Sequence, residues 1–311
     1  MIEALTKRVR SNVQKVIVGN DDVIDRLLVA VICEGHVLLE DVPGIGKTTL
    51  ARALATSLGC SFRRIQFTPD LLPSDVTGIN WFNQKKQEFE FRPGPILSQV
   101  VLADEINRAT PRTQSALLEA MQERQVTVDG RTHHLERPFL VLATQNPIEL
   151  AGTFPLPEAQ VDRFMMRLEL GYPTELDENA ILERFRAEDP LPSLEAVTSP
   201  DEILASQKER MDIRVEESVR SYLVQVVRAT REHDEIELGA SPRAALALYQ
   251  ASQAWGAIQG RDYVIPDDIK DLAPDVLTHR LMISPQAQLR GRKPQDLVAG
   301  IVDSIPVPVE D

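Results

Sequence analysis

The apolar positions in the first half of the chain follow one repeated pattern. Short runs of consecutive apolar residues alternate with longer stretches in which apolar side chains recur every three or four positions, such as Val23, Leu27, Leu28 and Val31. The longer stretches are typical of helices, and continuous apolar runs are typical of strands buried on both faces. The pattern therefore predicts an α/β fold in which helices cover both faces of a mostly parallel sheet. The predicted strands are residues 36–40, 61–67, 98–104, 138–144 and 164–171.

Two segments interrupt this alternation with the pattern of a β-hairpin. Residues 80–95 alternate apolar and polar side chains around a polar tip at Asn83–Gln87. Residues 125–137 contain the dipeptide Asp129-Gly130, which favours a two-residue hairpin turn. We expect both segments to be hairpin insertions in the α/β domain.

The strand pattern ends at Tyr172-Pro173, and the rest of the chain predicts helices alone. We therefore expect two domains, an α/β domain over residues 1–171 and an all-α domain over residues 172–311. The predicted helices of the second domain are residues 175–185, 215–231, 241–255 and 266–281.

Charge is distributed unevenly between these two parts. Residues 1–171 carry 19 basic and 21 acidic side chains, whereas residues 172–311 carry 15 and 26. A protein that holds nucleic acid by its phosphates usually presents a basic face. The acidic second part argues against nucleic acid there, although the first part still has room for a local basic patch.

Cellular location is indicated by three features of the chain. The two cysteines, Cys33 and Cys60, lie among apolar or small residues without CxxC spacing, so we expect two buried free thiols in a reducing compartment. The first 16 residues are typical of a charged amphipathic helix rather than a secretory signal. No run approaches the roughly 18 apolar residues of a membrane span. We expect a cytoplasmic protein without membrane insertion.

The strongest chemical signal is the run EDVPGIGKTTL, residues 40–50, which follows a predicted strand and opens a predicted helix near Lys47. The backbone N–H groups of Gly44 to Thr48 are placed to surround a phosphate at a helix N-terminus. Lys47 supplies a positive charge for the phosphate oxygens, and the Thr48 hydroxyl is suited to Mg²⁺. The consensus opening glycine of this loop is Asp41 here, and we expect Pro43-Gly44 to form the turn instead. The alternative, a glycine turn that only joins strand to helix, does not account for the Lys-Thr pair.

A second signal is the run VVLADE, residues 100–105, in which a buried strand ends in two carboxylates. We expect Asp104 to hold Mg²⁺ through water and Glu105 to polarise the attacking water. The strand VLATQNP ends at Asn146, where the alternatives are a γ-phosphate and water sensor or a turn-forming Asn-Pro pair.

These runs resemble the AAA+ ATPases, and within them the MoxR family. The resemblance is carried by residues 16–21, 40–49, 100–123, 142–149, 152–164 and 239–244 and covers nearly the whole chain. It implies a P-loop αβα domain followed by a helical lid, assembled into rings, usually hexamers, with ATP at subunit interfaces. It also implies that the hairpins are the helix-2 insert and the pre-sensor hairpin of this clade.

The resemblance also assigns residue roles. Val18 and Gly19 lie near the adenine, Asn146 is sensor 1, Arg163 is the arginine finger, and Arg243 is sensor 2. With the motifs above, the expected ATP-binding residues are Val18, Gly19, Pro43, Gly44, Ile45, Gly46, Lys47, Thr48, Thr49, Asp104 and Arg243, with Thr48 and Asp104 also at Mg²⁺. The expected catalytic residues are Lys47, Glu105, Asn146, Arg163 and Arg243.

Both arginines have simpler interpretations. Arg163 could pair on the surface with Asp162 or Glu158, a contact worth about 0–1 kcal/mol. Arg243 begins a predicted helix, where a cation opposes the macrodipole, so an anionic partner is expected. Arg108 and Arg112 fit either an interface or solvent.

Three further groups of residues favour structural interpretations. His133-His134 lacks additional metal-ligand spacing and is expected at the surface. Lys85-Lys86 is more typical of a solvated turn than of a DNA contact. Trp255 is expected in the core of the helical domain.

The resemblance implies ATP-driven remodelling, maturation or activation of protein partners, typically proteins with von Willebrand factor A domains. Three alternatives remain: a nucleic-acid motor, the ATPase subunit of a magnesium-chelatase-like complex, and a nucleotide-switched scaffold with negligible turnover. The intact Lys47, Asp104 and Glu105 argue against the scaffold, and the sparse basic residues at the hairpin tips argue against the motor.

Overall fold

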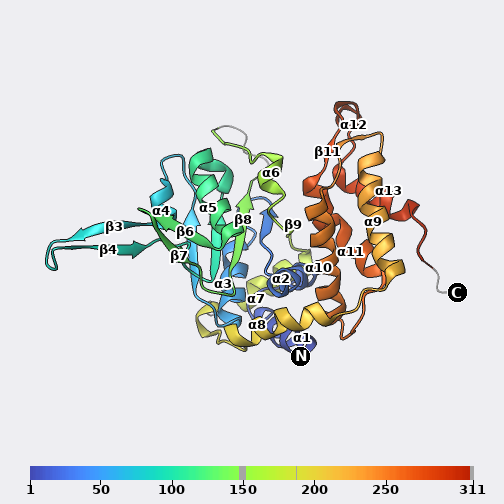
Figure 1. The fold of residues 1–311 in the computed structure, drawn as a ribbon. Helices are drawn as coiled ribbons and strands as arrows, with labels where there is room; N and C mark the ends of the chain where they lie inside the picture. The colour runs from blue at the N-terminus through green and yellow to red at the C-terminus, as the bar shows by residue number, and fades with distance from the viewer. Residues whose placement is uncertain (147–151, 187, 309–311) are drawn as a thin grey trace.

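The computed structural model describes residues 1–146, 152–186 and 188–308 of the chain (Figure 1). Residues 147–149 of the predicted motif that begins at residue 142 lie outside the described residues. The α/β part consists of β1 (Val37–Glu40), β2 (Phe62–Gln66), β5 (Val100–Asp104), β8 (Leu140–Gln145), β9 (Met166–Leu168), α1 (Ile2–Val13), α2 (Asp21–Ile32), α3 (Lys47–Ser57), α4 (Pro73–Thr77), α5 (Pro111–Glu123) and α6 (Glu158–Val161).

The five strands form one parallel sheet in the order β2-β5-β8-β1-β9. Successive side chains of a strand point to opposite faces of the sheet, so each face contributes apolar side chains to a buried core. In β1, Val37 and Leu39 join a core with α1, α2 and α3, whereas Leu38 joins a second core with α5. The predicted parallel sheet with helices on both faces is confirmed.

The carboxyl ends of β1, β5 and β8 lie side by side, because these strands are parallel neighbours with β8 in the middle. The P-loop follows β1, the two acidic residues end β5, and Asn146 follows β8. In sheets of this kind, ligands bind at the carboxyl ends of the strands. The topology therefore collects the candidate residues at one edge of the sheet.

Two antiparallel hairpins leave the α/β part where the sequence predicts them: β3 (Gly78–Asn83) with β4 (Glu88–Pro93), and β6 (Gln125–Val128) with β7 (Arg131–His134). The β3–β4 hairpin extends away from the body of the molecule (Figure 1). The ring of His133 stacks on Phe91 of this hairpin, with ring centroids 3.8 Å apart. The prediction of a surface site is therefore wrong for His133, which packs between the hairpins, whereas His134 is exposed.

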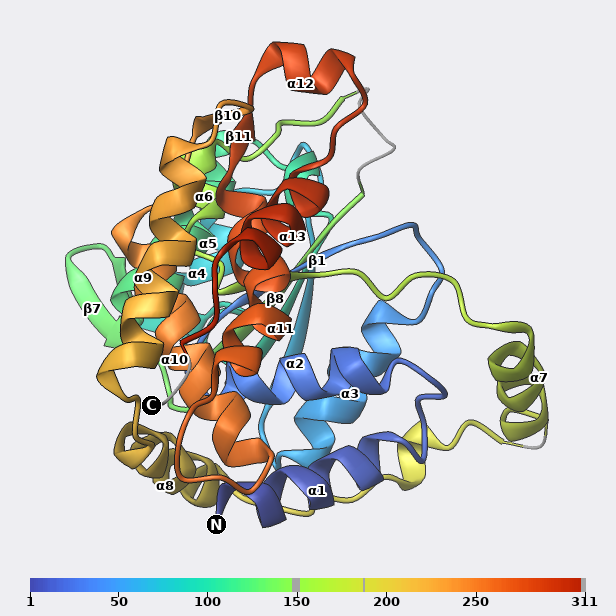
Figure 2. The same ribbon diagram turned by 90° about the vertical axis from the view of Figure 1, so that its right-hand side faces the viewer.

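The remaining helices are α7 (Glu175–Arg184), α8 (Pro200–Glu209), α9 (Glu217–Glu232), α10 (Pro242–Ile258), α11 (Pro266–Leu277), α12 (Pro285–Leu289) and α13 (Pro294–Ser304). The described residues also form the 3-10 turns η1 (Ile106–Arg108), η2 (Leu191–Ser193), η3 (Arg210–Asp212) and η4 (Thr278–Arg280). Helices α9, α10, α11 and α13 pack together as the lid (Figure 2). The lid also contains a short antiparallel ribbon, β10 (Ile236–Leu238) with β11 (Met282–Ile283).

The segment that links the sheet to the lid runs along the α/β part. The amide of Val197 donates to the Ser57 carbonyl of α3, and Gln207 of α8 donates to the Val31 carbonyl of α2. Helix α7 stands apart from the lid helices (Figure 2). It is held by Arg184, which donates to the carbonyls of Gln14 and Ile17.

Two local expectations need correction. Cys60 is buried, but Cys33 is only half-buried, and its thiol donates to the Gln250 carbonyl. Burial raises the pKa of Cys33 to about 12. The fifth predicted strand is shorter than expected, since β9 contains only Met166–Leu168.

Candidate nucleotide-binding site

The P-loop has the backbone that its glycines were expected to provide. Gly44 and Gly46 have φ angles of +87° and +93°, a conformation that residues with a Cβ atom rarely adopt. A Cβ atom at either position would meet no other atom within 4 Å, so the glycines are required by backbone conformation and the loop opens onto free space. Helix α3 begins directly afterwards at Lys47, so its first N–H groups face this space.

Lys47 donates from Nζ to the Asp41 carbonyl at 2.7 Å. Partial burial lowers the pKa of Lys47, and the charges of Asp41, Asp104 and Glu105 act in the opposite direction. The side chain therefore lies within the electrostatic influence of both predicted catalytic carboxylates.

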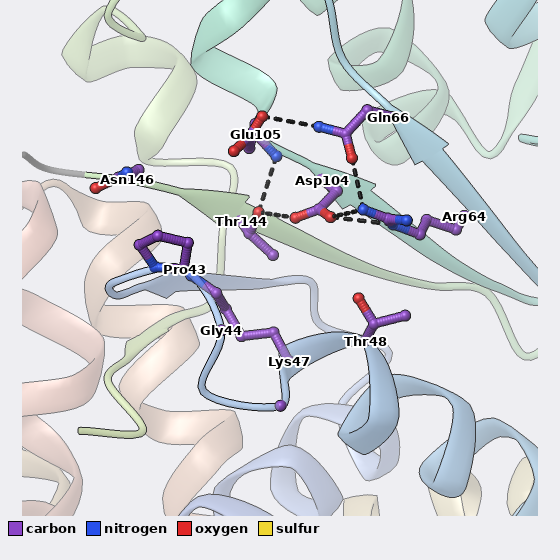
Figure 3. Close-up of a pocket in the computed structure, with 11 residues that line it drawn as sticks. Pro43, Gly44, Lys47, Thr48, Arg64, Gln66, Asp104, Glu105, Thr144 and Asn146 are labelled. Atoms are coloured by element: carbon purple, nitrogen blue, oxygen red, sulfur yellow. Dashed lines mark hydrogen bonds and ion pairs between the residues drawn. The ribbon is translucent and has the colours of Figure 1, made fainter. Parts of the chain in front are cut away.

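A cavity of about 260 Å³ lies between the P-loop and the ends of β2, β5 and β8 (Figure 3). Its lining is polar and charged, as a site for phosphate and a metal requires. The residues that line it are Pro43, Gly44, Gly46, Lys47, Thr48, Arg64, Gln66, Asp104, Glu105, Thr144 and Asn146.

The two carboxylates in this cavity are held by different partners. Asp104 Oδ1 accepts a hydrogen bond from the Thr144 hydroxyl at 2.5 Å, and Asp104 Oδ2 pairs with Arg64 at 2.6 Å. Glu105 Oε2 accepts from the Gln66 amide at 2.8 Å and pairs with Arg108 at 3.2 Å. Both oxygens of Asp104 are therefore engaged by residues of the two neighbouring strands.

Glu105 also has an unusual backbone. Its φ is +56°, and its amide donates to the Thr144 hydroxyl at 2.8 Å. Residues other than glycine adopt this conformation mainly where the surroundings enforce it, often at functional sites. Glu105 lines the cavity, and Figure 3 shows its carboxylate next to Gln66 on the side opposite the P-loop.

Sequence reasoning missed Arg64, Gln66 and Thr144. Arg64 and Gln66 are two positions apart on β2, so they share one face of that strand. Thr144 lies on β8 directly before Gln145. The only sequence signal was the presence of polar residues at the ends of predicted strands, and the order of the strands in the sheet is needed to bring them to Asp104.

A second, more apolar cavity of about 470 Å³ lies on the other side of the P-loop. Its lining includes Val16, Ile17, Val18, Asn20, Pro43, Gly44, Ile45, Gly46, Thr49, Leu50, Leu170, Gly171, Tyr172, Pro173, Glu178, Ile181 and Phe185. Gly19 has φ +69°, and a Cβ atom at this position would lie 3.1 Å from the Asp177 carboxylate of α7. An apolar cavity beside a polar one suits a base and its phosphates.

Asp41, which replaces the consensus glycine, links the start of the P-loop to the residues that follow β9. Its Oδ2 accepts from the amides of Leu170 and Gly171 at 2.5 and 2.9 Å, and its Oδ1 accepts from Val42 at 3.1 Å. Leu170 and Gly171 line the apolar cavity, so Asp41 fastens the start of the P-loop to the wall of that cavity.

The donor set in the polar cavity fits Mg²⁺. A nucleotide-bound Mg²⁺ usually takes one or two protein oxygens together with phosphates and waters. The Thr48 hydroxyl and the Asp104 carboxylate line the same cavity, next to the loop that would hold the phosphates. The assignment of metal and nucleotide to these residues stays a prediction.

The two predicted arginines lie elsewhere. Arg163 and Arg243 line a separate cavity of about 170 Å³ together with His36, Met121 and Gln122. Arg163 lies between α6 and β9, beside the amino-terminal ends of β9 and β1. The five residue steps from His36 to Asp41 span about 16 Å along the strand direction. The structure therefore does not bring Arg163 or Arg243 to the chain's own P-loop.

Arg243 does have an anionic neighbour, as its position at the start of α10 predicts. Its Nη1 lies 3.8 Å from Asp162 Oδ2, and the side chain is about half exposed. The expected anion is thus supplied within the chain by Asp162. The alternative in which Arg163 pairs on the surface with Asp162 or Glu158 is not observed among the described residues, and Asp162 pairs with Arg243 and Arg280 instead.

Comparison with known proteins agrees with this architecture. Residues 36–166 match the family described as "ATPase family associated with various cellular activities (AAA)", and residues 228–301 match the AAA lid domain. The chain is similar to the chaperone MoxR1 of Mycobacterium tuberculosis, with 41% identity over 305 residues that cover 95% of this chain and 80% of that protein. It is also similar to an uncharacterised Bacillus subtilis protein, YeaC, with 50% identity over 299 residues that cover 96% and 93%.

A solved structure supports the same relationship. The crystal structure of a Cytophaga hutchinsonii protein assigned as an ATPase matches with a TM-score of 0.93 and 41% identity, covering 99% of this chain and 96% of that one. Among the described residues, no helix is long and apolar enough to cross a membrane. The two family matches, the identity to MoxR1 and the shared fold together show that the chain belongs to the MoxR family of AAA+ ATPases.

Proposed function

We propose that the chain hydrolyses Mg²⁺-ATP in a ring, the hexamer that its family resemblance implies, and uses the energy to remodel protein partners. The observation that carries this proposal is the division of the candidate machinery between two edges of one parallel sheet. The P-loop, Asp104 and Glu105 lie at one edge, and Arg163 and Arg243 lie together beside the other. A site divided in this way is complete when the two edges of neighbouring subunits meet.

Each side chain has a distinct task in this proposal. The first N–H groups of α3 and Lys47 bind the phosphates, and Thr48 and Asp104 hold the metal. Bound Mg²⁺ would neutralise phosphate charge. Glu105 orients the attacking water, and Asn146, at the end of β8, contacts the water or the γ-phosphate. Arg163 and Arg243 of one subunit stabilise charge on the neighbour's phosphates, for which a permanently charged, forked guanidinium is suited.

The partner is proposed to be a protein. One of the chain's relatives is a chaperone, MoxR1, and the family resemblance implies clients with von Willebrand factor A domains. The β3–β4 hairpin presents exposed apolar side chains, Ile79, Trp81, Phe82 and Phe89. Of the two lysines at its tip, Lys86 pairs with Glu90 at 2.5 Å, which leaves the single exposed Lys85 as a cation for phosphate. These features favour a protein partner over nucleic acid.

The experiment is a mixing series at fixed total protein. Arg163→Ala subunits keep an intact ATP site, and Lys47→Ala subunits keep an intact Arg163. Arg163→Ala alone should hydrolyse ATP poorly, because an arginine finger contributes about 10³–10⁵ in rate in other P-loop enzymes. Lys47→Ala alone should also hydrolyse ATP poorly, because its own ATP site lacks the lysine that binds the phosphates. Mixed rings should recover part of the activity. Full turnover by Arg163→Ala alone would refute the role of Arg163, and mixtures without any recovery would count against a site shared between subunits.

The choice of partner is tested separately. Addition of duplex or single-stranded DNA at moderate salt should leave turnover unchanged, whereas a client with a von Willebrand factor A domain should alter it. Strong stimulation by DNA that disappears as salt rises would instead support a nucleic-acid motor, since phosphate contacts weaken steeply with salt.

A further inference from the structure

The lid forms several hydrogen bonds with the short loop of residues 162–165, which carries Arg163. Arg280 of η4 is the centre of this contact, with a side chain that is only 2% exposed. Its Nε donates to Asp162 Oδ1 at 2.8 Å, and its Nη2 donates to the Phe164 carbonyl at 2.7 Å. Its Nη1 donates to the carbonyls of Met165 and Val276. One buried guanidinium therefore joins both sides of Arg163 to the lid helix α11.

Other lid residues hold the same loop. The Ser241 hydroxyl lies 3.3 Å from each carboxylate oxygen of Asp162, and Arg243 lies 3.8 Å from Oδ2. The ring of His279 bonds to the Phe164 carbonyl at 3.0 Å. Burial is the main reason that the pKa of His279 lies well below its usual value, so the ring is neutral and this contact adds no charge.

Arg163 differs from its neighbours in this loop. Its amide donates to the Gln160 carbonyl at 3.2 Å, but within residues 1–146, 152–186 and 188–308 its guanidinium has no ion pair. It borders the cavity that it shares with Arg243. The loop is thus fixed through Asp162 and the backbone of Phe164 and Met165, while the side chain between them stays available.

We propose that Asp162 and Arg280 are positioning residues for Arg163. This inference rests on the proposed function, in which Arg163 acts on the nucleotide of the next subunit. Contacts with the lid hold the loop in a fixed position beside the start of β9. This position directs the Arg163 guanidinium toward the ATP site of the neighbouring subunit. Loss of Arg280 would remove the buried donor to the Asp162 carboxylate and to the carbonyls of residues 162, 164, 165 and 276, and the loop would lose its fixed position.

The test measures rescue in mixed rings, in which the variant is introduced only into the subunit that supplies Arg163. Donor subunits carry Lys47→Ala and cannot use their own ATP site, and acceptor subunits carry Arg163→Ala. Plain donors are expected to restore turnover. Donors that also carry Arg280→Met are expected to restore at least tenfold less, through kcat rather than KM, because the acceptor's ATP pocket is unchanged. Donors with Arg280→Lys should give an intermediate rescue, since an ammonium keeps the charge but not the planar fork.

A matched control separates positioning from general damage to the lid. Arg210 of η3 is another buried arginine, with 7% of the residue exposed as for Arg280, and it donates to Gln253 of the lid helix α10 rather than to the loop. Donors with Arg210→Met should rescue as well as plain donors. Hydrogen exchange of the amides of residues 161–166 gives a readout without turnover, and it should rise in the Arg280→Met donor and stay unchanged in the Arg210→Met donor.

Each outcome decides the proposal. Equal rescue by Arg280→Met and plain donors, or equal loss with Arg210→Met, would overturn the positioning role while leaving the shared site intact. Failure of plain donors to rescue would overturn the shared site and, with it, this inference. If Arg280→Met does not assemble, the comparison uses Arg280→Lys, which keeps the charge, and Asp162→Asn, which keeps the shape of the side chain, and both are expected to reduce rescue severalfold.

Discussion

Replacement of Asp41 by glycine would give the P-loop its consensus opening residue, and we predict that it destabilises the protein. The carboxylate of Asp41 accepts hydrogen bonds from the amides of Leu170 and Gly171, which lie about 130 positions further along the chain. No side chain remains in the Asp41→Gly protein to make these contacts. The consensus sequence thus predicts that glycine at position 41 is favourable, whereas the observed structure predicts that it lowers stability.

The size of the effect follows from the contacts. A hydrogen bond to a charged group contributes about 1.5–3 kcal/mol. The lower value applies here, because Gly171 is exposed and Leu170 is half-buried, so the two bonds together contribute about 3 kcal/mol. The extra backbone freedom of glycine adds roughly 0.5–1 kcal/mol to the loss. A change of this size corresponds to a melting temperature lower by about 10 °C for a domain of this length.

Thermal unfolding followed by circular dichroism measures this change, with Asp41→Asn as the matched control. Asparagine keeps one acceptor oxygen and should lose about half as much stability. Fluorescent ATP analogues should also bind more weakly to Asp41→Gly, because Leu170 and Gly171 line the apolar cavity. A glycine variant as stable as the wild type would show that the link between Asp41 and residues 170–171 contributes nothing.

Three further predictions concern the site and the core. Glu105→Gln should lower ATP turnover at least tenfold with binding retained, whereas Lys47→Ala should weaken binding itself, and titration of a fluorescent nucleotide separates the two. Arg64→Ala should reduce severalfold the Mg²⁺ concentration needed for nucleotide binding, because the Arg64 guanidinium no longer competes with Mg²⁺ for Asp104. An unchanged midpoint in a Mg²⁺ titration of nucleotide binding would contradict this. Burial lowers the pKa of His36 to about 4, so between that value and about 6.5 the unfolded chain binds a proton that the folded chain does not. The contribution of His36 should therefore lower stability as pH decreases, by on the order of 2 kcal/mol from pH 7 to pH 5 in denaturant titrations. His36→Gln should reduce the pH dependence by that amount and leave the contribution of the same sign from His279.

The sequence was sufficient for the features that local patterns determine. Continuous apolar runs indicated the five strands, and the run from Glu40 to Leu50 located the P-loop and the start of α3. The hairpin turn at Asp129-Gly130 was also recognisable, because its conformation is set by adjacent residues.

Features that depend on strand order or on distant contacts were not recognisable. Arg64 meets Asp104 only because β2 pairs with β5 in a register that places Gln66 opposite Asp104. The partner of Asp41 lies beyond β9, and no local pattern connects the two. His133 was assigned to the surface because its stacking partner, Phe91, belongs to a different hairpin.

The surroundings of Asp162 show how local and long-range information combine. Strands β1 and β9 are parallel neighbours, so residues before β9 and the loop after β1 lie at opposite edges of the sheet. Arg163 precedes β9 and the P-loop follows β1, which separates the two. The lid then adds Arg243 and Arg280, which both pair with Asp162, while Arg163 borders the same cavity as Arg243. Arg280 is buried and neutralised by Asp162, which leaves Arg163 and Arg243 as an excess of positive charge on a protein with a net charge of −13. A cationic pair at the surface of an acidic protein suits an anionic partner, and the phosphates of a neighbour's nucleotide meet that requirement.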